Sequence, residues 1–190
     1  MSLGNQKKPM FTLKALTSCA VLCAVTVVVS RIMSLVPNEA SRYSIEAVPI
    51  FLSGLLFGPI AGSFVGFASD FIGCMFSPFG YNPIFSLPPI LYGLSAGIFA
   101  GYIKKSCSAL RIAIAFAAPI ILGSVLWQSF ALSLIYGGGA KTEYFTAKLI
   151  ERGIQFGVMW VIDTLLVWML LKSKVLAGTG VLKIGKGKKR

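Results

Sequence analysis

Residues 45–76 read IEAVPIFLSGLLFGPIAGSFVGFASDFIGCMF, an almost wholly apolar stretch that Gly58-Pro59 divides near its middle. Proline has no backbone N–H and ends or breaks a helix, so the stretch predicts two helices, at 45–58 and 59–76. The first has about 14 residues and is too short to cross a bilayer upright, because a spanning helix needs roughly 20. Short or broken helices of this kind often line cavities in membrane proteins.

Further apolar stretches lie on both sides of this one in the 190-residue chain. They predict helices at about 11–36, 84–103, 110–136 and 144–171. A chain this apolar must satisfy its backbone amides within helices or a closed barrel, and the stretches lack the two-residue alternation of a barrel. The sequence therefore predicts an all-α polytopic membrane protein, a six-transmembrane-helix bundle forming a single membrane domain over 11–172.

The ionisable residues concentrate at the helix ends and predict the topology. An even number of spans puts both termini on one side, and the more cationic side faces the cytoplasm. Lysines and arginines gather at 7–14, 104–111 and 172–190, whereas Glu39, Glu46, Glu143 and Glu151 fall on the other side. We therefore expect a cytoplasmic N-terminus (1–10), a basic cytoplasmic tail (173–190) and a place in a prokaryotic cell membrane.

This topology also accounts for the formal net charge of +12, which needs no nucleic acid as a partner. The basic tail is expected to contact anionic headgroups of the lipid bilayer.

Groups that could carry catalysis are sparse within the predicted helices. Asp70 and Asp163 are the only acids expected within the membrane core, they fall on different helices, and the chain has no histidine. Catalysis by paired carboxylates or by a bound metal needs such groups together at one depth. The four cysteines lack a complete metal-ligand spacing and are predicted to be packing residues. The sequence predicts no enzyme, no cofactor and no metal site, and it leaves the role of Asp163 open.

Small residues recur every four positions on several predicted helices, a spacing that lets membrane helices approach closely. The series are Gly54, Gly58, Gly62 and Gly66; Gly93, Gly97 and Gly101; and Ala20 and Ala24 on the first helix. We interpret the glycine series as packing within the chain. The alanine pair lies in the cytoplasmic half, where a partner subunit is an equally good explanation.

Charged, aromatic and amide side chains gather in the half that this topology places outside. The candidate substrate-binding residues are Arg31, Arg42, Asp70, Tyr81, Asn82, Trp127, Gln128, Arg152 and Gln155. Arginines bind carboxylates in a bidentate geometry, aromatic rings stack on heterocycles, and carboxylate or amide groups read a ring's hydrogen-bonding edge. The set favours a planar, anionic small molecule.

The same residues could instead have structural or lipid-contacting roles. The arginines could reach lipid headgroups, and Trp127 could pack against lipid or the core. Asp70 could form a purely structural pair with an arginine, because a buried carboxylate needs a cation or a proton.

A series of short motifs runs in a fixed order along the chain. They are Ser30-Arg31, Arg42-Tyr-Ser44, Phe57-Gly-Pro59, Asp70, Gly80-Tyr-Asn-Pro83, Leu87-Pro-Pro-Ile-Leu-Tyr-Gly93, Leu126-Trp-Gln-Ser129 and Arg152-x-x-Gln155-Phe156. With them, residues 12–171 resemble the substrate-binding S components of energy-coupling factor (ECF) vitamin transporters, specifically the folate family.

The resemblance implies a six-helix S component whose vitamin pocket opens to the outside. Such a subunit associates with a transmembrane T subunit and two cytoplasmic ATPase subunits, and it is thought to topple in the membrane to release its substrate inward. Ala20 and Ala24 match the small-residue motif that S components use to meet the T subunit. Arg31 lies seven residues beyond Ala24, on about the same helical face. If the helix is straight, this one face cannot both line the pocket through Arg31 and dock against the T subunit through Ala24.

The resemblance implies folate as the vitamin. The loop between the third and fourth helices departs from the longer Pro-x-Gly-x-Tyr-x-Pro form of that family, so another vitamin or a heterocyclic precursor stays open. An autonomous secondary transporter is a further alternative, although the two halves show no convincing inverted repeat.

Overall fold

The computed structural model describes residues 13–34, 45–76, 80–106, 108–139 and 141–173, and these residues form helices and the turns between them. The elements are α1 (Leu13–Ser34), α2 (Ala47–Phe57), α3 (Pro59–Met75), the 3-10 helix η1 (Pro83–Ser86), α4 (Leu87–Lys105), α5 (Ala109–Pro119), the π-helix η2 (Ile120–Trp127), α6 (Gln128–Tyr136) and α7 (Lys141–Lys172). The predicted all-α class is confirmed, and each expected helix is present. The predicted N-terminal segment 1–10 and nearly all of the tail 173–190 lie outside the described residues.

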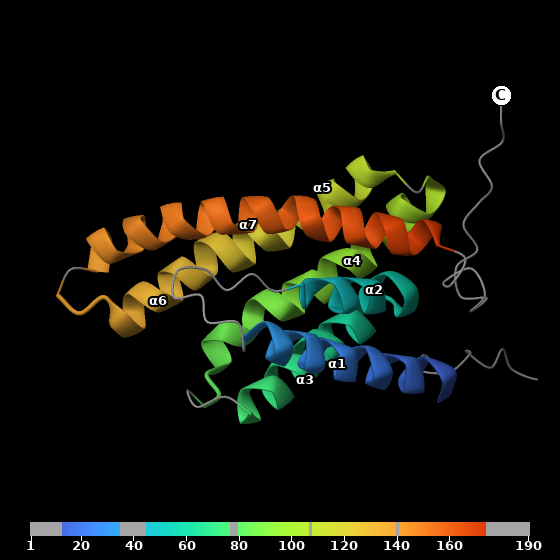
Figure 1. The fold of residues 1–190 in the computed structure, drawn as a ribbon, viewed down its shortest axis with the longest axis horizontal. Helices are drawn as coiled ribbons and strands as arrows, with labels where there is room; N and C mark the ends of the chain where they lie inside the picture. Colours follow the sequence, from blue (N-terminus) through green and yellow to red (C-terminus); the bar gives the residue numbers. More distant parts are fainter. Residues whose placement is uncertain (1–12, 35–44, 77–79, 107, 140, 174–190) are drawn as a thin grey trace, which may run out of the picture.

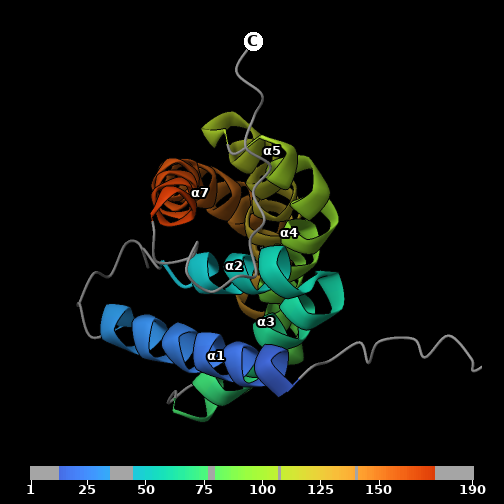
Figure 2. The ribbon, with the colours of Figure 1, turned by 90° about the vertical axis from the view of Figure 1, so that its right-hand side faces the viewer.

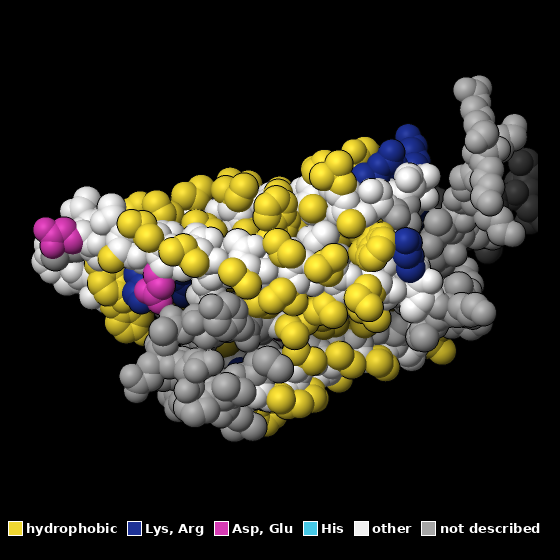
Figure 3. Space-filling view, turned by 45° about the horizontal axis from the view of Figure 1, so that its top comes forward, with side chains coloured by type: hydrophobic (Ala, Val, Ile, Leu, Met, Phe, Trp, Pro, Cys, Tyr) yellow, Lys and Arg dark blue, Asp and Glu magenta, His cyan; other side chains and the backbone are white. Residues whose placement is uncertain are grey.

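Four helical segments are long and apolar enough to cross a membrane. They are Ala15–Ile32 of α1, Pro83–Lys105, Ala109–Tyr136 and Lys141–Lys172, while α2 and α3 are apolar but shorter. Figure 3 shows hydrophobic side chains over the middle of the molecule and charged side chains towards its two ends. An exposed apolar belt of this extent suits a lipid environment rather than water.

Helix α2 lies at the centre of the bundle and contacts α1, α3, α4 and α7. Figure 1 shows that it occupies only one half of the long axis, since the α6–α7 hairpin projects beyond it at the other end. The rings of Phe51 in α2 and Phe116 in α5 stack with their centroids 4.0 Å apart, and the Tyr92 ring of α4 lies 6.0 Å from Phe116. This core joins α2, α4, α5 and α7.

The break at Gly58-Pro59 turns α2 and α3 into a helical hairpin. Gly58 has a φ of 98°, in the left-handed region that glycine adopts without steric cost, and Pro59 opens α3. A Cβ on Gly62 would lie 2.5 Å from the Gly54 Cα, so these two residues, four positions on either side of Gly58, face each other. The predicted break is confirmed.

The glycine series bring three helices into backbone contact. A Cβ on Gly93 of α4 would lie 2.1 Å from the Gly62 carbonyl, one on Gly66 would lie 2.3 Å from the Pro89 oxygen, and one on Gly97 would lie 2.2 Å from the Pro59 nitrogen. The packing interpretation is therefore confirmed at these positions. It does not extend to Gly101, around which there is nothing within 4 Å among the described residues.

The segment predicted as one helix at 110–136 is continuous but not uniform. It changes from α5 to the π-helix η2 directly after Pro119 and returns to α-helical geometry at Gln128. Proline removes an amide from the hydrogen-bonding ladder, and π-segments inside α-helices often occur at functional sites. The wider turn sets the direction in which Trp127 and Gln128 leave the helix.

Candidate functional site

The described charges divide the bundle into two ends. One end, here called the basic end, carries Lys104, Lys105, Arg111 and Lys172, and the opposite end carries the turn between α6 and α7. Most candidate residues lie towards this opposite end: Arg31 in the last turn of α1, Asp70 in the second half of α3, Tyr81 and Asn82 before η1, Gln128 at the start of α6, and Arg152 and Gln155 in α7. Arg42 lies outside the described residues.

Asp70 is held by hydroxyl and thiol groups from two elements. The Ser86 hydroxyl of η1 donates to Asp70 Oδ2 at 2.5 Å, and the Cys74 thiol lies 3.9 Å from Oδ1. Tyr81 Oη is 3.1 Å from the same Ser86 hydroxyl, and its ring meets Phe71 edge-on at 5.0 Å. Asp70 thus ties η1 and the loop before it to α3, which is a structural role beside any contact with a ligand.

Arg31 reaches from α1 to the end of α3. Its guanidinium donates to the Gly73 carbonyl, and its charge acts on the Asp70 carboxylate. The absence of a side chain at Gly73 leaves room for this approach, since a Cβ there would lie 3.2 Å from the Arg31 Nη2. Arg31 and Asp70 therefore belong to one polar group.

Arg152 and Gln128 form a second polar group between α7 and α6. Arg152 Nη1 donates to Gln128 Oε1, and its guanidinium lies over the Phe156 ring, 5.9 Å from the centroid. The guanidinium is planar and rigid, so the Gln128 oxygen that holds one of its nitrogens also sets the orientation of its other N–H groups. The pair is suited to grip an anion.

Trp127 links the two groups. Its indole Nε1 donates to the Ile84 carbonyl of η1 at 2.7 Å, and η1 also carries Ser86. Asn82 caps η1 by accepting a hydrogen bond from the Ile84 amide at 3.1 Å. Trp127 and Asn82 thus hold η1 in place, and the prediction that all these residues share one cavity stays a prediction.

A third group of polar side chains, which we call the central acid pair, comprises Glu46 and Asp163. Glu46 precedes α2, and its charge acts on Asp163 of α7 as well as on Tyr92 of α4. The Tyr92 hydroxyl makes a hydrogen bond of 2.9 Å with Ser124 of η2. Neither Glu46 nor Tyr92 was predicted for the site, because each becomes informative only through neighbours on other helices. Asp163 could have been chosen as an acid within an apolar helix.

The predicted docking residues Ala20 and Ala24 are exposed on α1. The buried face of this helix instead carries Cys19 and Cys23, which pack against Ala61 and Val65 of α3 and so confirm the packing role predicted for these cysteines. Arg31 donates to the Gly73 carbonyl of α3 while Ala20 and Ala24 stay exposed, so the described structure is compatible with both predicted roles.

The fold and the site define a membrane-embedded component of a small-molecule transporter. Residues 10–172 match the family described as "ECF-type riboflavin transporter, S component", and the chain belongs to this family of S components. The family is one of transporter subunits, not of enzymes.

Two relatives carry the name of another vitamin. The "Folate transporter FolT" of Clostridium novyi (strain NT) is 26% identical over 140 residues, which is 73% of this chain and 79% of the relative. A solved structure, "Crystal structure of FolT bound with folic acid", superposes with a TM-score of 0.68 at 26% identity, covering 84% of this chain and 93% of that one. The family description and these relatives thus name different vitamins, both built on fused planar rings.

Proposed function

We propose that this chain is the folate-binding S component of an ATP-driven ECF-type importer. The observation that carries the proposal is its similarity to FolT bound with folic acid, which extends over 93% of that chain. Arginines at the end opposite the basic end add support, because folate carries carboxylates on its glutamate whereas riboflavin does not. The neutral ribityl chain of riboflavin offers no carboxylate to Arg152.

Arg152 is the strongest candidate for the carboxylate. Gln128 fixes one of its nitrogens and Phe156 lies beneath the guanidinium, so the remaining donors need little reorganisation when an anion arrives. Arg31 donates to Gly73 and neighbours Asp70, which makes it the weaker candidate for the same task.

The orientation and the partners complete the proposal. The basic end faces the cytoplasm by the positive-inside rule, so both termini are cytoplasmic and the candidate residues face outward. A transmembrane T subunit and two ATPase subunits supply the energy, and the exposed alanines Ala20 and Ala24 give the T subunit a face that permits close helix approach.

The proposal is tested by titrating the purified chain with folic acid, with pteroic acid, which lacks the glutamate, and with riboflavin. Wild type should bind folic acid most tightly, and Arg152→Ala should weaken folic acid by about ten- to hundredfold, since one charge-assisted contact contributes about 1.5–3 kcal/mol. Pteroic acid should lose much less in this variant. Mass spectrometry of the ligand that copurifies in mild detergent provides an independent readout.

The family description favours riboflavin as the second candidate. Tighter binding of riboflavin than of folic acid by wild type would replace the proposal with this one. Uptake of the vitamin by cells that lack T and ATPase subunits would instead indicate an autonomous secondary transporter.

A further inference from the structure

The buried face of α7 carries a carboxylate among largely apolar residues. Residues recurring every four positions on this face are Gln155, Met159, Asp163, Val167 and Leu171. Asp163 is only 3% exposed, whereas residues on the other faces of α7, such as Val161 and Ile162, are open. A carboxylate so placed is costly unless it is hydrogen-bonded or paired.

Asp163 lacks such a partner within the described part of the chain. Its Oδ1 is fully buried and accepts no hydrogen bond there. The charge that acts on it belongs to a second acid, Glu46, and like charges oppose each other. A buried carboxylate whose Oδ1 accepts no hydrogen bond from the described residues therefore favours a ligand that brings hydrogen-bond donors.

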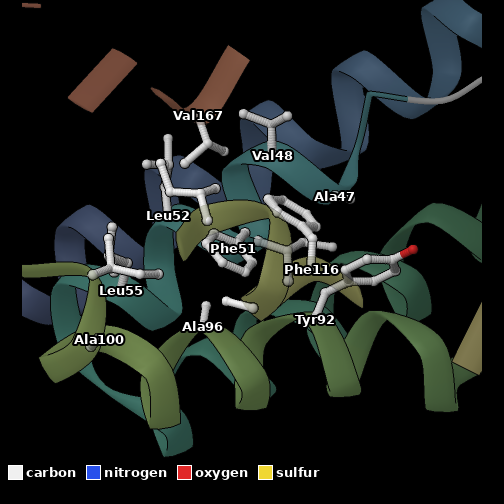
Figure 4. Packing of buried hydrophobic residues seen from close by; sticks show 14 of the residues in the cluster. Ala47, Val48, Phe51, Leu52, Leu55, Tyr92, Ala96, Ala100, Phe116 and Val167 are labelled. Atoms are coloured by element: carbon white, nitrogen blue, oxygen red, sulfur yellow. The ribbon is translucent and has the colours of Figure 1, made fainter. Parts of the chain in front are cut away.

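Asp163 lies on α7, which packs against α2, α5, α6 and η2. Glu46 stands at the start of α2, which Figure 1 shows near the middle of the long axis, and Tyr92 and Ser124 come from α4 and η2. Figure 4 shows Val167, one turn from Asp163, above Val48 and Leu52 of α2, while the Tyr92 hydroxyl points away from the apolar cluster. The Tyr92 hydroxyl thus lies at the edge of the apolar cluster.

Helix geometry aligns Asp163 with Arg152. The two residues are eleven positions apart, which is three helical turns, so they lie on about the same face of α7 and about 16 Å apart along its axis. The site therefore presents a cation, Arg152, and a hydrogen-bond acceptor, Asp163, at two positions along α7. A molecule complementary to both has an anionic tail and, at about that distance, a ring edge rich in N–H donors.

We propose that Asp163 is the acceptor for the ring of the ligand. Its carboxylate receives two N–H donors from one edge of a 2-amino-4-oxopteridine, the ring N3–H and the exocyclic 2-amino group, while the tail lies at Arg152. This subsite rests on the proposed folate function and deepens it, because it selects against flavins. The corresponding flavin edge has one N–H between two carbonyls, which a carboxylate repels.

The test compares folic acid with its counterpart in which an oxo group replaces the 2-amino group. The change removes one donor and adds an acceptor with almost no change in shape. Wild type is expected to bind folic acid at least about tenfold more tightly, because the oxo counterpart puts an acceptor against a buried carboxylate. Equal affinities in wild type would overturn the subsite without any mutant.

The variant Asp163→Asn should change the order of preference. An amide offers one acceptor and one donor, which match the N3–H and the new carbonyl of the oxo counterpart. We expect the variant to lose about tenfold or more for folic acid and to prefer the oxo compound. A variant that keeps the wild-type preference would contradict the proposal.

Ser95→Ala is the matched control. Ser95 is buried in α4, and its hydroxyl already donates to the Tyr92 carbonyl within the same helix. It should keep both affinities at the wild-type level, which separates loss of a buried polar group from loss of the ring acceptor. If wild type binds neither pteridine, the folate assignment itself fails, and the subsite with it.

Discussion

Replacing Gly93 by alanine tests the close contact on which the α3–α4 interface depends. A Cβ at this position would lie 2.1 Å from the carbonyl carbon and oxygen of Gly62, whereas ordinary contacts begin near 3.4 Å. Relief requires the two helices to separate by about 1.3 Å, since the obstacle is backbone and cannot rotate away. Overpacking of this kind costs typically 1–3 kcal/mol and occasionally more.

Gly101→Ala in the same helix is the control, because nothing lies within 4 Å of its added methyl group among the described residues. Alanine there should stabilise by about 0.5–1 kcal/mol, through the intrinsic helix preference alone. The two variants should therefore differ by about 1.5–4 kcal/mol. For a chain of this size the difference corresponds to roughly 3–16 °C in midpoint temperature.

The assay is thermal unfolding of both variants in one detergent, followed by titration with folic acid. Gly93→Ala should also bind less tightly, because separation of α3 from α4 moves Asp70 away from Ser86, whose hydroxyl now donates at 2.5 Å. Midpoint temperatures for Gly93→Ala and Gly101→Ala within about one degree of each other would refute the reasoning. They would show that the α3–α4 contact tolerates a methyl group at Gly93.

Two further predictions concern the ends of the bundle. Ser86→Ala should lower stability by about 1.5–3 kcal/mol, measured by thermal unfolding, because it removes a hydrogen bond to the Asp70 carboxylate; an unchanged midpoint would show that Asp70 finds another donor. Ala20→Leu and Ala24→Leu should weaken copurification with the T subunit and leave folic acid affinity unchanged, because bulk on an exposed small-residue face blocks helix approach. An equal loss of ligand affinity would place that face inside the subunit.

The helices were predictable because their signal is local. A stretch of apolar residues long enough for the bilayer has few alternatives to a helix, and Gly58-Pro59 fixes where α2 ends and α3 begins. The glycine spacing predicted close contacts, but not that Gly97 packs against the hairpin turn while Gly101 has no described residue within 4 Å of an added Cβ. Spacing defines a face of a helix, and only the neighbouring helices decide whether that face is covered.

The π-helix and the roles of the polar residues could not be predicted in the same way. Pro119 signalled a disturbance in its helix, yet whether the chain kinks or widens depends on the packing around it. Asn82 and Trp127 are predicted to bind substrate, which stays a prediction, and the structure adds that both hold η1 through hydrogen bonds to the amide and the carbonyl of Ile84. A polar side chain in a sequence does not show which of its possible partners will be nearest.

Helix α7 explains why Asp163 resisted interpretation from sequence. Its 32 residues span about 48 Å, more than the roughly 30 Å of hydrocarbon, so a count from its first residue overstates how deep Asp163 lies. Counted from Lys172 at the basic end, Asp163 stands about 14 Å along the axis and Arg152 about 30 Å. A hydrocarbon layer of about 30 Å that began at Lys172 would have Asp163 near its midplane and Arg152 near its far boundary. Transporters place their substrate sites near the midplane, and a buried acid that accepts no hydrogen bond at Oδ1 from the described residues gains most from a ligand that brings donors.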